Sequence, residues 1–291
     1  MNQHLDPKAT VAASAASTMN GRLGSFHLEF RRNGHRTRIG RQFVSYPFHM
    51  TRPFDLDKDI QHLLTVYQQS SSGGLYRADN LSSEYTIGNQ AAAHVTTQAA
   101  TMVHNCYGKP ALQTLKIDAG EDSFFAFTPD PMVLFPGAAS QTRTHINMSN
   151  KAAVLLTESF DRHDPTASNK IFDQICSYMD VRNDAGKLLL RDRFAVKGAD
   201  LVSQSSPVGP WRIVTNGLIL GDLSRLPSLA NLNDIGQTEG AILGVSSLPN
   251  GAGWGVRCLA KSATASRSVC DQLLRICAES ALGSSPALRR K

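Results

Sequence analysis

Apolar and polar residues alternate near the start of this chain and then meet a turn sequence. Phe26, Leu28 and Phe30 are separated by polar residues, which is the pattern of a strand with one buried face. Asn33 and Gly34 follow, and this pair tolerates the positive φ angles of a tight hairpin turn. The segment therefore predicts a β-hairpin.

The same strand signal recurs along most of the chain, with turn residues such as Gly73-Gly74 and Asp79-Asn80 in between. This spacing predicts a mainly β fold of stacked sheets. No repeat of fixed period is visible, so the sequence does not support a propeller or a regular solenoid. The further predicted strands span residues 63–68, 82–87, 112–117, 124–127, 142–148, 153–160, 171–181, 187–194, 212–220 and 241–245.

Two segments predict helices. In 263–282, Val269, Leu273 and Ile276 fall on one helical face, and Gly283 is placed to end the helix. A shorter helix is predicted around 226–232. We expect a single β-rich domain with about two helices, the longer one near the C-terminus.

The domain organisation predicted from the sequence has three parts: a disordered N-terminal extension (1–20), a β domain (21–285) and a basic C-terminal tail (286–291). No apolar run approaches the roughly 18 residues that a membrane-spanning helix needs, so no membrane is expected as a partner. The five cysteines are widely spaced and form no CxxC pair, which favours a reducing, cytoplasmic location over a disulfide framework or a structural zinc site.

The formal net charge is +6, and an arginine-rich segment contributes much of it. Basic surfaces attract acidic partners, nucleic acid included. The segment has no interleaved aromatic residues, and the chain has no zinc-finger spacing, so we expect a solvated or protein-facing hairpin and no nucleic acid. The arginines of this expected docking surface are Arg31, Arg32, Arg36, Arg38 and Arg41.

Catalytic signatures such as GxSxG, HExxH and GxxxxGK[ST] are absent, so we expect no enzyme. His104 and Cys106 would leave an extended strand on the same face, and their nitrogen and sulfur atoms suit nickel or zinc. His163 lies in an Asp- and Pro-rich segment close to Glu158. These residues could be transient metal ligands, or an ordinary surface histidine, thiol and turn.

Several fragments occur in the order found in one protein family, and the chain resembles the urease accessory protein UreD (UreH) over most of 22–285. The TTQAAT stretch with the upstream GGL…D element is fairly specific. The fragments are FHLEF with the arginine hairpin, RPF at 52–54, GGL at 73–75 with DNL at 79–81, VTTQAA at 95–100, PDP at 129–131 and LTE at 156–158.

The resemblance implies a non-enzymatic, β-rich scaffold that binds apo-urease and UreF, which in turn recruits the GTPase UreG, so that nickel is delivered to urease. It also implies an internal nickel passage with weak ligands and no tightly bound cofactor, because an ion in a complete tetrahedral site would leave too slowly. The residues expected to line it are Asp79, Thr96, Thr97, Gln98 and Glu158.

Two functions from other classes stay open at this point. A β-rich carbohydrate-active enzyme would need two carboxylates about 5 to 9.5 Å apart, and Asp79 with Glu158 could serve only if the fold brings them together. A basic nucleic-acid-binding module would show an affinity that falls steeply with salt.

Overall fold

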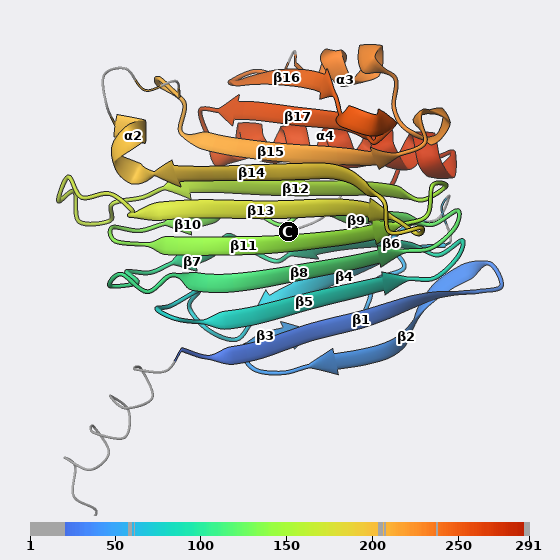
Figure 1. Ribbon diagram of the computed structural model, residues 1–291, viewed down its shortest axis with the longest axis horizontal. Helices are drawn as coiled ribbons and strands as arrows, with labels where there is room; N and C mark the ends of the chain where they lie inside the picture. The colour runs from blue at the N-terminus through green and yellow to red at the C-terminus, as the bar shows by residue number, and fades with distance from the viewer. Residues whose placement is uncertain are drawn as a thin grey trace, which may run out of the picture.

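Two stacked β-sheets form the body of the molecule (Figure 1). The computed structural model describes residues 21–57, 60, 62–202, 206, 208–236 and 238–287. The first sheet runs, in spatial order, through β14 (Leu188–Lys197), β13 (Gln174–Asn183), β11 (Ala139–Met148), β8 (Ala111–Ala119), β5 (Asn80–Ile87), β1 (Leu23–Asn33) and β2 (Arg36–Val44).

The second sheet is wider than the first and extends past it at one side. Its main path runs through β16 (Ala241–Ser247), β17 (Gly253–Ala260), β15 (Ile213–Gly221), β12 (Ala153–Arg162), β9 (Phe124–Phe127), β6 (Ala92–Thr97), β4 (Leu63–Ser70) and β3 (Phe48–Met50). Off this path, β10 (Met132–Leu134) pairs with β12, and β7 (Thr101–Val103) pairs with β10.

The middle of the chain winds as a parallel coil. Successive strands mostly alternate between the two sheets, and β5, β8, β11 and β13 pair in parallel, as do β4, β6, β9 and β12. The strands of the first set begin at Asn80, Ala111, Ala139 and Gln174, so the turns of the coil have unequal lengths. This irregularity hides the coil from a search for a fixed sequence period.

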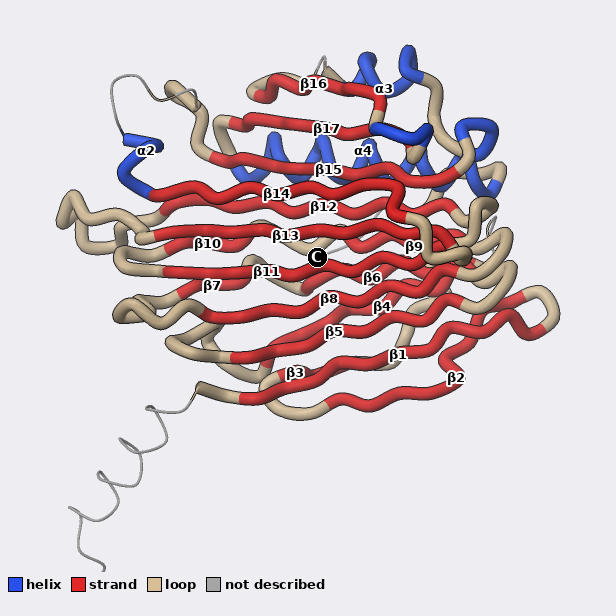
Figure 2. The backbone as a smooth tube through the Cα atoms, viewed as in Figure 1, coloured by secondary structure: helices blue, strands red, loops and turns tan. Residues whose placement is uncertain are grey.

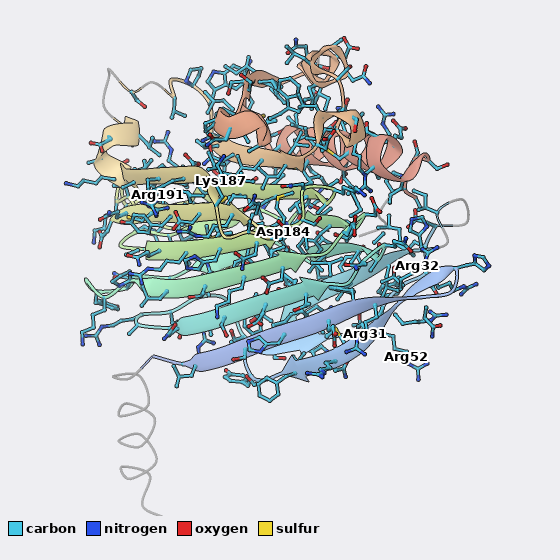
Figure 3. The ribbon with its side chains drawn as sticks, turned by 45° about the vertical axis from the view of Figure 1, so that its right-hand side comes forward. Arg31, Arg32, Arg52, Asp184, Lys187 and Arg191 are labelled. Carbon is cyan, nitrogen blue, oxygen red and sulfur yellow. The ribbon has the colours of Figure 1, made fainter. Side chains whose placement is uncertain are left out.

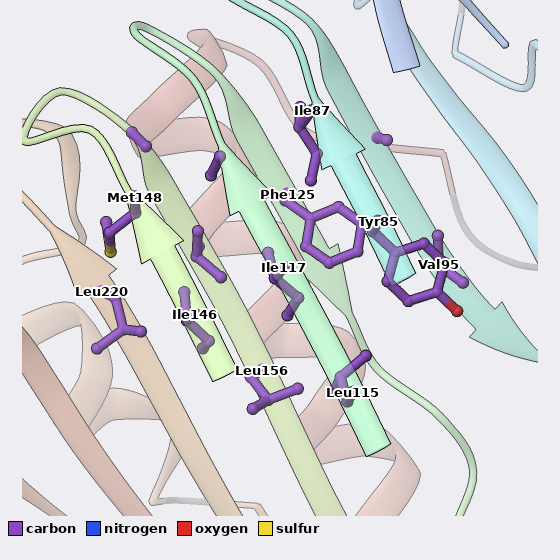
Figure 4. Packing of buried hydrophobic residues seen from close by; sticks show 14 of the residues in the cluster. Tyr85, Ile87, Val95, Leu115, Ile117, Phe125, Ile146, Met148, Leu156 and Leu220 are labelled. Carbon is purple, nitrogen blue, oxygen red and sulfur yellow. The ribbon is translucent and has the colours of Figure 1, made fainter. Parts of the chain in front are cut away.

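The main core fills the space between the sheets at one end (Figure 4). Tyr85 and Ile87 of β5 point inward, as do Ile117 of β8 and Ile146 of β11, and all four are fully buried. The Tyr85 ring lies 5.2 Å from that of Phe125 on the second sheet. Packing of these side chains holds the two sheets together, since parallel sheets depend on buried faces.

Helices lie at one side of the sandwich, as Figure 2 shows in blue: α2 (Gly198–Val202), α3 (Leu229–Ile235) and α4 (Ala263–Leu282). Residues of α4 such as Val269 and Leu273 pack against the outer face of the second sheet. The Ser262 side chain accepts a hydrogen bond from the Ala265 N–H, and Gly283 ends the helix with φ of 84°. The predicted bounds of this helix are therefore confirmed.

The mainly β fold is confirmed, while some local predictions shift. Asn33 pairs with Arg36, so the hairpin turn consists of Gly34 and His35, of which only Gly34 has positive φ. The short helix begins three residues later than predicted, because Ser228 caps it. The predicted extension (1–20) and most of the predicted tail (288–291) lie outside the described residues. None of the helices described is both long and apolar enough to cross a membrane.

Candidate functional site

The space between the sheets becomes polar toward one end. Along β12, the inward positions Val154 and Leu156 are followed by Glu158, and along β8, Ile117 and Leu115 lead to Gln113. A cavity of ≈ 530 Å³ lies here between the two sheets. Its polar lining includes Gln68, Ser83, Thr97, Gln113, Thr142 and Glu158.

Glu158 is the carboxylate that the second sheet places on this cavity. The Ser177 hydroxyl of the first sheet donates a hydrogen bond of 2.8 Å to its Oε2. Burial raises the pKa of Glu158 above its ordinary value, and the negative charge of Asp192 raises it further. The Ser177 hydrogen bond and the positive charge of Arg257 act in the opposite direction. Glu158 therefore keeps its proton to a higher pH than an exposed carboxylate does, and a cation that binds it must displace that proton.

Replacing Glu158 with glutamine is expected to stabilise the fold increasingly as pH rises. Between the ordinary pKa of 4.5 and the raised folded pKa, the folded chain binds one more proton than the unfolded chain. The free energy of unfolding then falls with pH, by at most about 1.4 kcal/mol per unit, and the glutamine variant escapes this loss. Urea denaturation of both chains from about pH 4 to pH 8 measures the difference. A difference that does not change with pH would contradict this assignment.

A second acidic residue, Asp130, also lines the cavity, although the sequence analysis gives it no role. Its main-chain N–H donates a hydrogen bond of 2.9 Å to Thr97 Oγ1, and its side chain lies 3.7 Å from the Arg267 guanidinium of α4. The available signal is the Pro129-Asp130-Pro131 fragment, which carries part of the family resemblance. Gln98, also on the lining, accepts a hydrogen bond from Gln69.

One wall of the cavity depends on a glycine. Gly74 has φ of +129°, and a Cβ atom there would lie 2.2 Å from the Met102 carbonyl oxygen. The next residue, Leu75, donates its N–H to that same oxygen at 2.8 Å. Only glycine allows the loop to approach β7 this closely, so the Gly73-Gly74 pair shapes the cavity wall.

Two of the five residues predicted to line a passage do not line this cavity. Thr96 leaves β6 on the opposite face from Thr97, and its hydroxyl donates to the Thr128 carbonyl oxygen at 2.7 Å. Asp79 is 1% exposed and forms an ion pair with Arg22. Because Asp79 is held there, the structure does not place it with Glu158 on one cleft, as a carbohydrate-active enzyme would need.

The three candidate metal ligands do not converge. Cys106 is fully buried and donates its thiol to two carbonyl oxygens, whereas the His104 ring stacks on Tyr76 at 4.5 Å. The Phe135 ring contacts the rings of both His104 and His163, at 5.4 and 5.6 Å. Within the described ranges, no group of three or more His, Cys, Asp or Glu side chains is placed to hold a metal ion.

The basic hairpin lies at the far side of the molecule from α4, on the edge strand β2 and its neighbour β1 (Figure 3). Its charge is partly neutralised: Arg31 lies 2.7 Å from Glu29, and Asp55 pairs with Arg36 and Arg38 at 3.2 and 3.1 Å. Arg41 keeps 87% of its side chain exposed. Arg32 donates to the Gly34 carbonyl oxygen at the turn. Because carboxylates lie between the arginines, the hairpin is better suited to bind another protein than the phosphate backbone of a nucleic acid.

Comparison with known proteins finds similarity along nearly the whole chain. The model of the family described as UreD urease accessory protein matches residues 22–291. A protein named urease accessory protein UreD 1 from Methylorubrum extorquens (strain PA1) is 38% identical over 287 residues, which cover 98% of this chain and 97% of the relative. UreD 3 from Bradyrhizobium sp. (strain ORS 278) is 37% identical, with coverage of 95% and 98%. UreD 1 from Pseudomonas syringae pv. syringae (strain B728a) is 32% identical, with coverage of 87% and 90%.

Proposed function

Because the chain belongs to the UreD family of urease accessory proteins, we propose that it acts in urease maturation as a non-enzymatic scaffold in the cytoplasm. In this role it binds apo-urease, recruits UreF and UreG, and assists the insertion of nickel into the urease active site. The observation that carries the proposal is the family match, which takes in every described strand and α4.

The cavity between the sheets supports a role in nickel passage. Nickel is a cargo here, and no tightly bound cofactor is invoked. A cation that moves on must meet several weak ligands in turn, because a complete set of strong ligands would retain it. Gln98, Thr97 and Glu158 supply amide, hydroxyl and carboxylate oxygens along the cavity.

The arginine hairpin is the docking surface that we propose for an acidic face of a partner. Its arginines stand on the edge strand β2 and its neighbour β1, and Arg41 is largely exposed although it lies 3.7 Å from Glu29. Charge complementarity at such a surface raises the rate of association and fixes the orientation of the partner. The intervening Glu29 and Asp55 would repel nucleic-acid phosphates and can pair with basic residues of a protein.

Co-purification tests the scaffold role directly. The full chain is expressed with affinity-tagged urease structural subunits, UreF and UreG, and the eluted complex is sized by light scattering. We expect apo-urease, UreF and this chain to elute together. If apo-urease and UreF elute together equally well when this chain is left out, it is not the scaffold that joins them.

A further inference from the structure

The two sheets do not end together, and this leaves a step at one side of the sandwich. The first sheet stops at β14, whereas the second continues through β15, β17 and β16 (Figure 1). The face of β17 that is turned away from α4 therefore has no strand of the first sheet over it. Val256 and Cys258 pack on the α4 side, so Arg257 between them lies on this uncovered face.

An ion pair crosses the step. Arg257 Nη2 lies 3.1 Å from Asp192 Oδ2 on β14, the last strand of the first sheet. The two side chains are 53% and 28% exposed, so the pair faces solvent on its outer side. Exposed pairs of this kind contribute about 0–1 kcal/mol, so thermal motion opens them readily.

A polar line leads from this ion pair to the cavity. Glu158 pairs with Asn216 of β15, and Asn216 pairs with Arg257 of β17, so the three occupy one row of the second sheet. Adjacent strands are about 4.8 Å apart, which places Glu158 about 10 Å from Arg257 along the sheet. Ser177 of the first sheet bonds to Glu158 from across the interior. Apolar residues, by contrast, close the far end of the sandwich.

The free space beside Glu158 is small in this structure. A void of ≈ 10 Å³ lies beside the carboxylate, bounded also by Ser177 and Phe194. This is about the volume that one water molecule needs, and too little for a hydrated cation. Both charges of the ion pair act on the Glu158 carboxyl, in opposite directions. The row from Glu158 through Asn216 leads to Arg257 on β17, over which the first sheet places no strand.

We propose that the Asp192–Arg257 ion pair is a gate over a second opening of the cavity, located at the step where the first sheet ends. This inference rests on the proposed passage of a divalent cation through the cavity. While Arg257 lies across the step, its positive charge repels a cation held at Glu158. When Arg257 turns into solvent, Asp192 becomes the next oxygen ligand along the path. The cavity then has an exit at the step.

Chemical labelling of the purified full chain tests the gate without urease. Ser177→Cys places a thiol beside Glu158, and its reaction with a positively charged methanethiosulfonate reagent reports access for cations. Adding Arg257→Ala is expected to speed this reaction by on the order of tenfold, since a repelling charge and a large side chain leave the path. The chain without the new cysteine gives the background, because its five native cysteines are all buried.

A matched control and a second variant distinguish opening of the gate from a general loosening of the fold. Arg275→Ala removes an arginine of similar exposure from an ion pair on α4, and the labelling rate should not change. Asp192→Asn breaks the ion pair but leaves the positive charge of Arg257 in place. The labelling rate should therefore rise more for a neutral methanethiosulfonate reagent than for the positively charged one. Equal rates with and without Arg257→Ala overturn the gate. Since urease is absent from the assay, that result would leave the scaffold role standing.

Discussion

Replacing Asp79 with alanine is expected to lower the free energy of unfolding by about 3–5 kcal/mol, because it leaves a partly buried arginine without its partner. Asp79 is 1% exposed and accepts hydrogen bonds from the Arg22 main chain and guanidinium and from the Tyr76 N–H. The Gly74 carbonyl oxygen and the Tyr46 side chain would then remain as hydrogen-bond partners of the guanidinium. The hydrogen bond to Asp79 also raises the pKa of Arg22, so the arginine stays charged. Urea denaturation at neutral pH measures the loss.

Asp55 provides a matched control for this prediction. It also pairs with arginines, Arg36 and Arg38, but its side chain is 40% exposed. Asp55→Ala should therefore cost less than about 1 kcal/mol. Equal losses for the two variants would contradict a structural role for the Asp79–Arg22 pair. The comparison also matters for function, since a failure of Asp79→Ala in urease maturation would come from an unstable fold.

Replacing Glu158 with glutamine is expected to lower the urease activity recovered after co-expression by on the order of tenfold. Negative charge in a cleft with low-dielectric walls raises the local concentration of cations by about 10- to 1000-fold, and we expect the low end of this range for one carboxylate. Glutamine keeps the size of the side chain and can still bond to Ser177. The fold should be at least as stable as before, because the buried carboxylate is gone. The amount of complex with apo-urease should be unchanged, so the loss is one of nickel delivery.

Glu121→Gln is the control for the loss of one carboxylate. Glu121 pairs with Lys151 on the surface, and its side chain is 53% exposed. Its replacement should leave the recovered urease activity unchanged. Full activity with Glu158→Gln would remove Glu158 from the proposed route, and loss of the complex would show that the residue serves assembly instead.

The sequence predicts those strands and helices that are specified by residues close together in the chain. The β1–β2 hairpin follows from alternation and a turn pair, and α4 follows from its apolar face with Gly283 as a stop. The sequence does not predict β6, because it begins with two alanines, or β17, because two glycines lie within it. The parallel coil depends on pairing between segments about 30 residues apart, and such pairing leaves little local signal.

The site was predicted only in part, for a similar reason. Thr97 and Thr96 are neighbours in the chain, but only the register of β6 decides which of them faces the cavity. Asp79 looks like any polar loop residue until the fold brings Arg22 to it. Asp130 lies in a recognisable fragment, yet its place on the cavity depends on β6 and α4. Long-range contacts therefore set the roles of these side chains.

The most direct test of the account measures urease maturation with and without this chain. Urease subunits, UreF and UreG are co-expressed in nickel-containing medium, and both the nickel content and the activity of the purified urease are determined. We expect urease made without this chain to hold little nickel and show little activity, and the full chain to restore both. Urease that is equally rich in nickel and equally active without this chain would contradict the account.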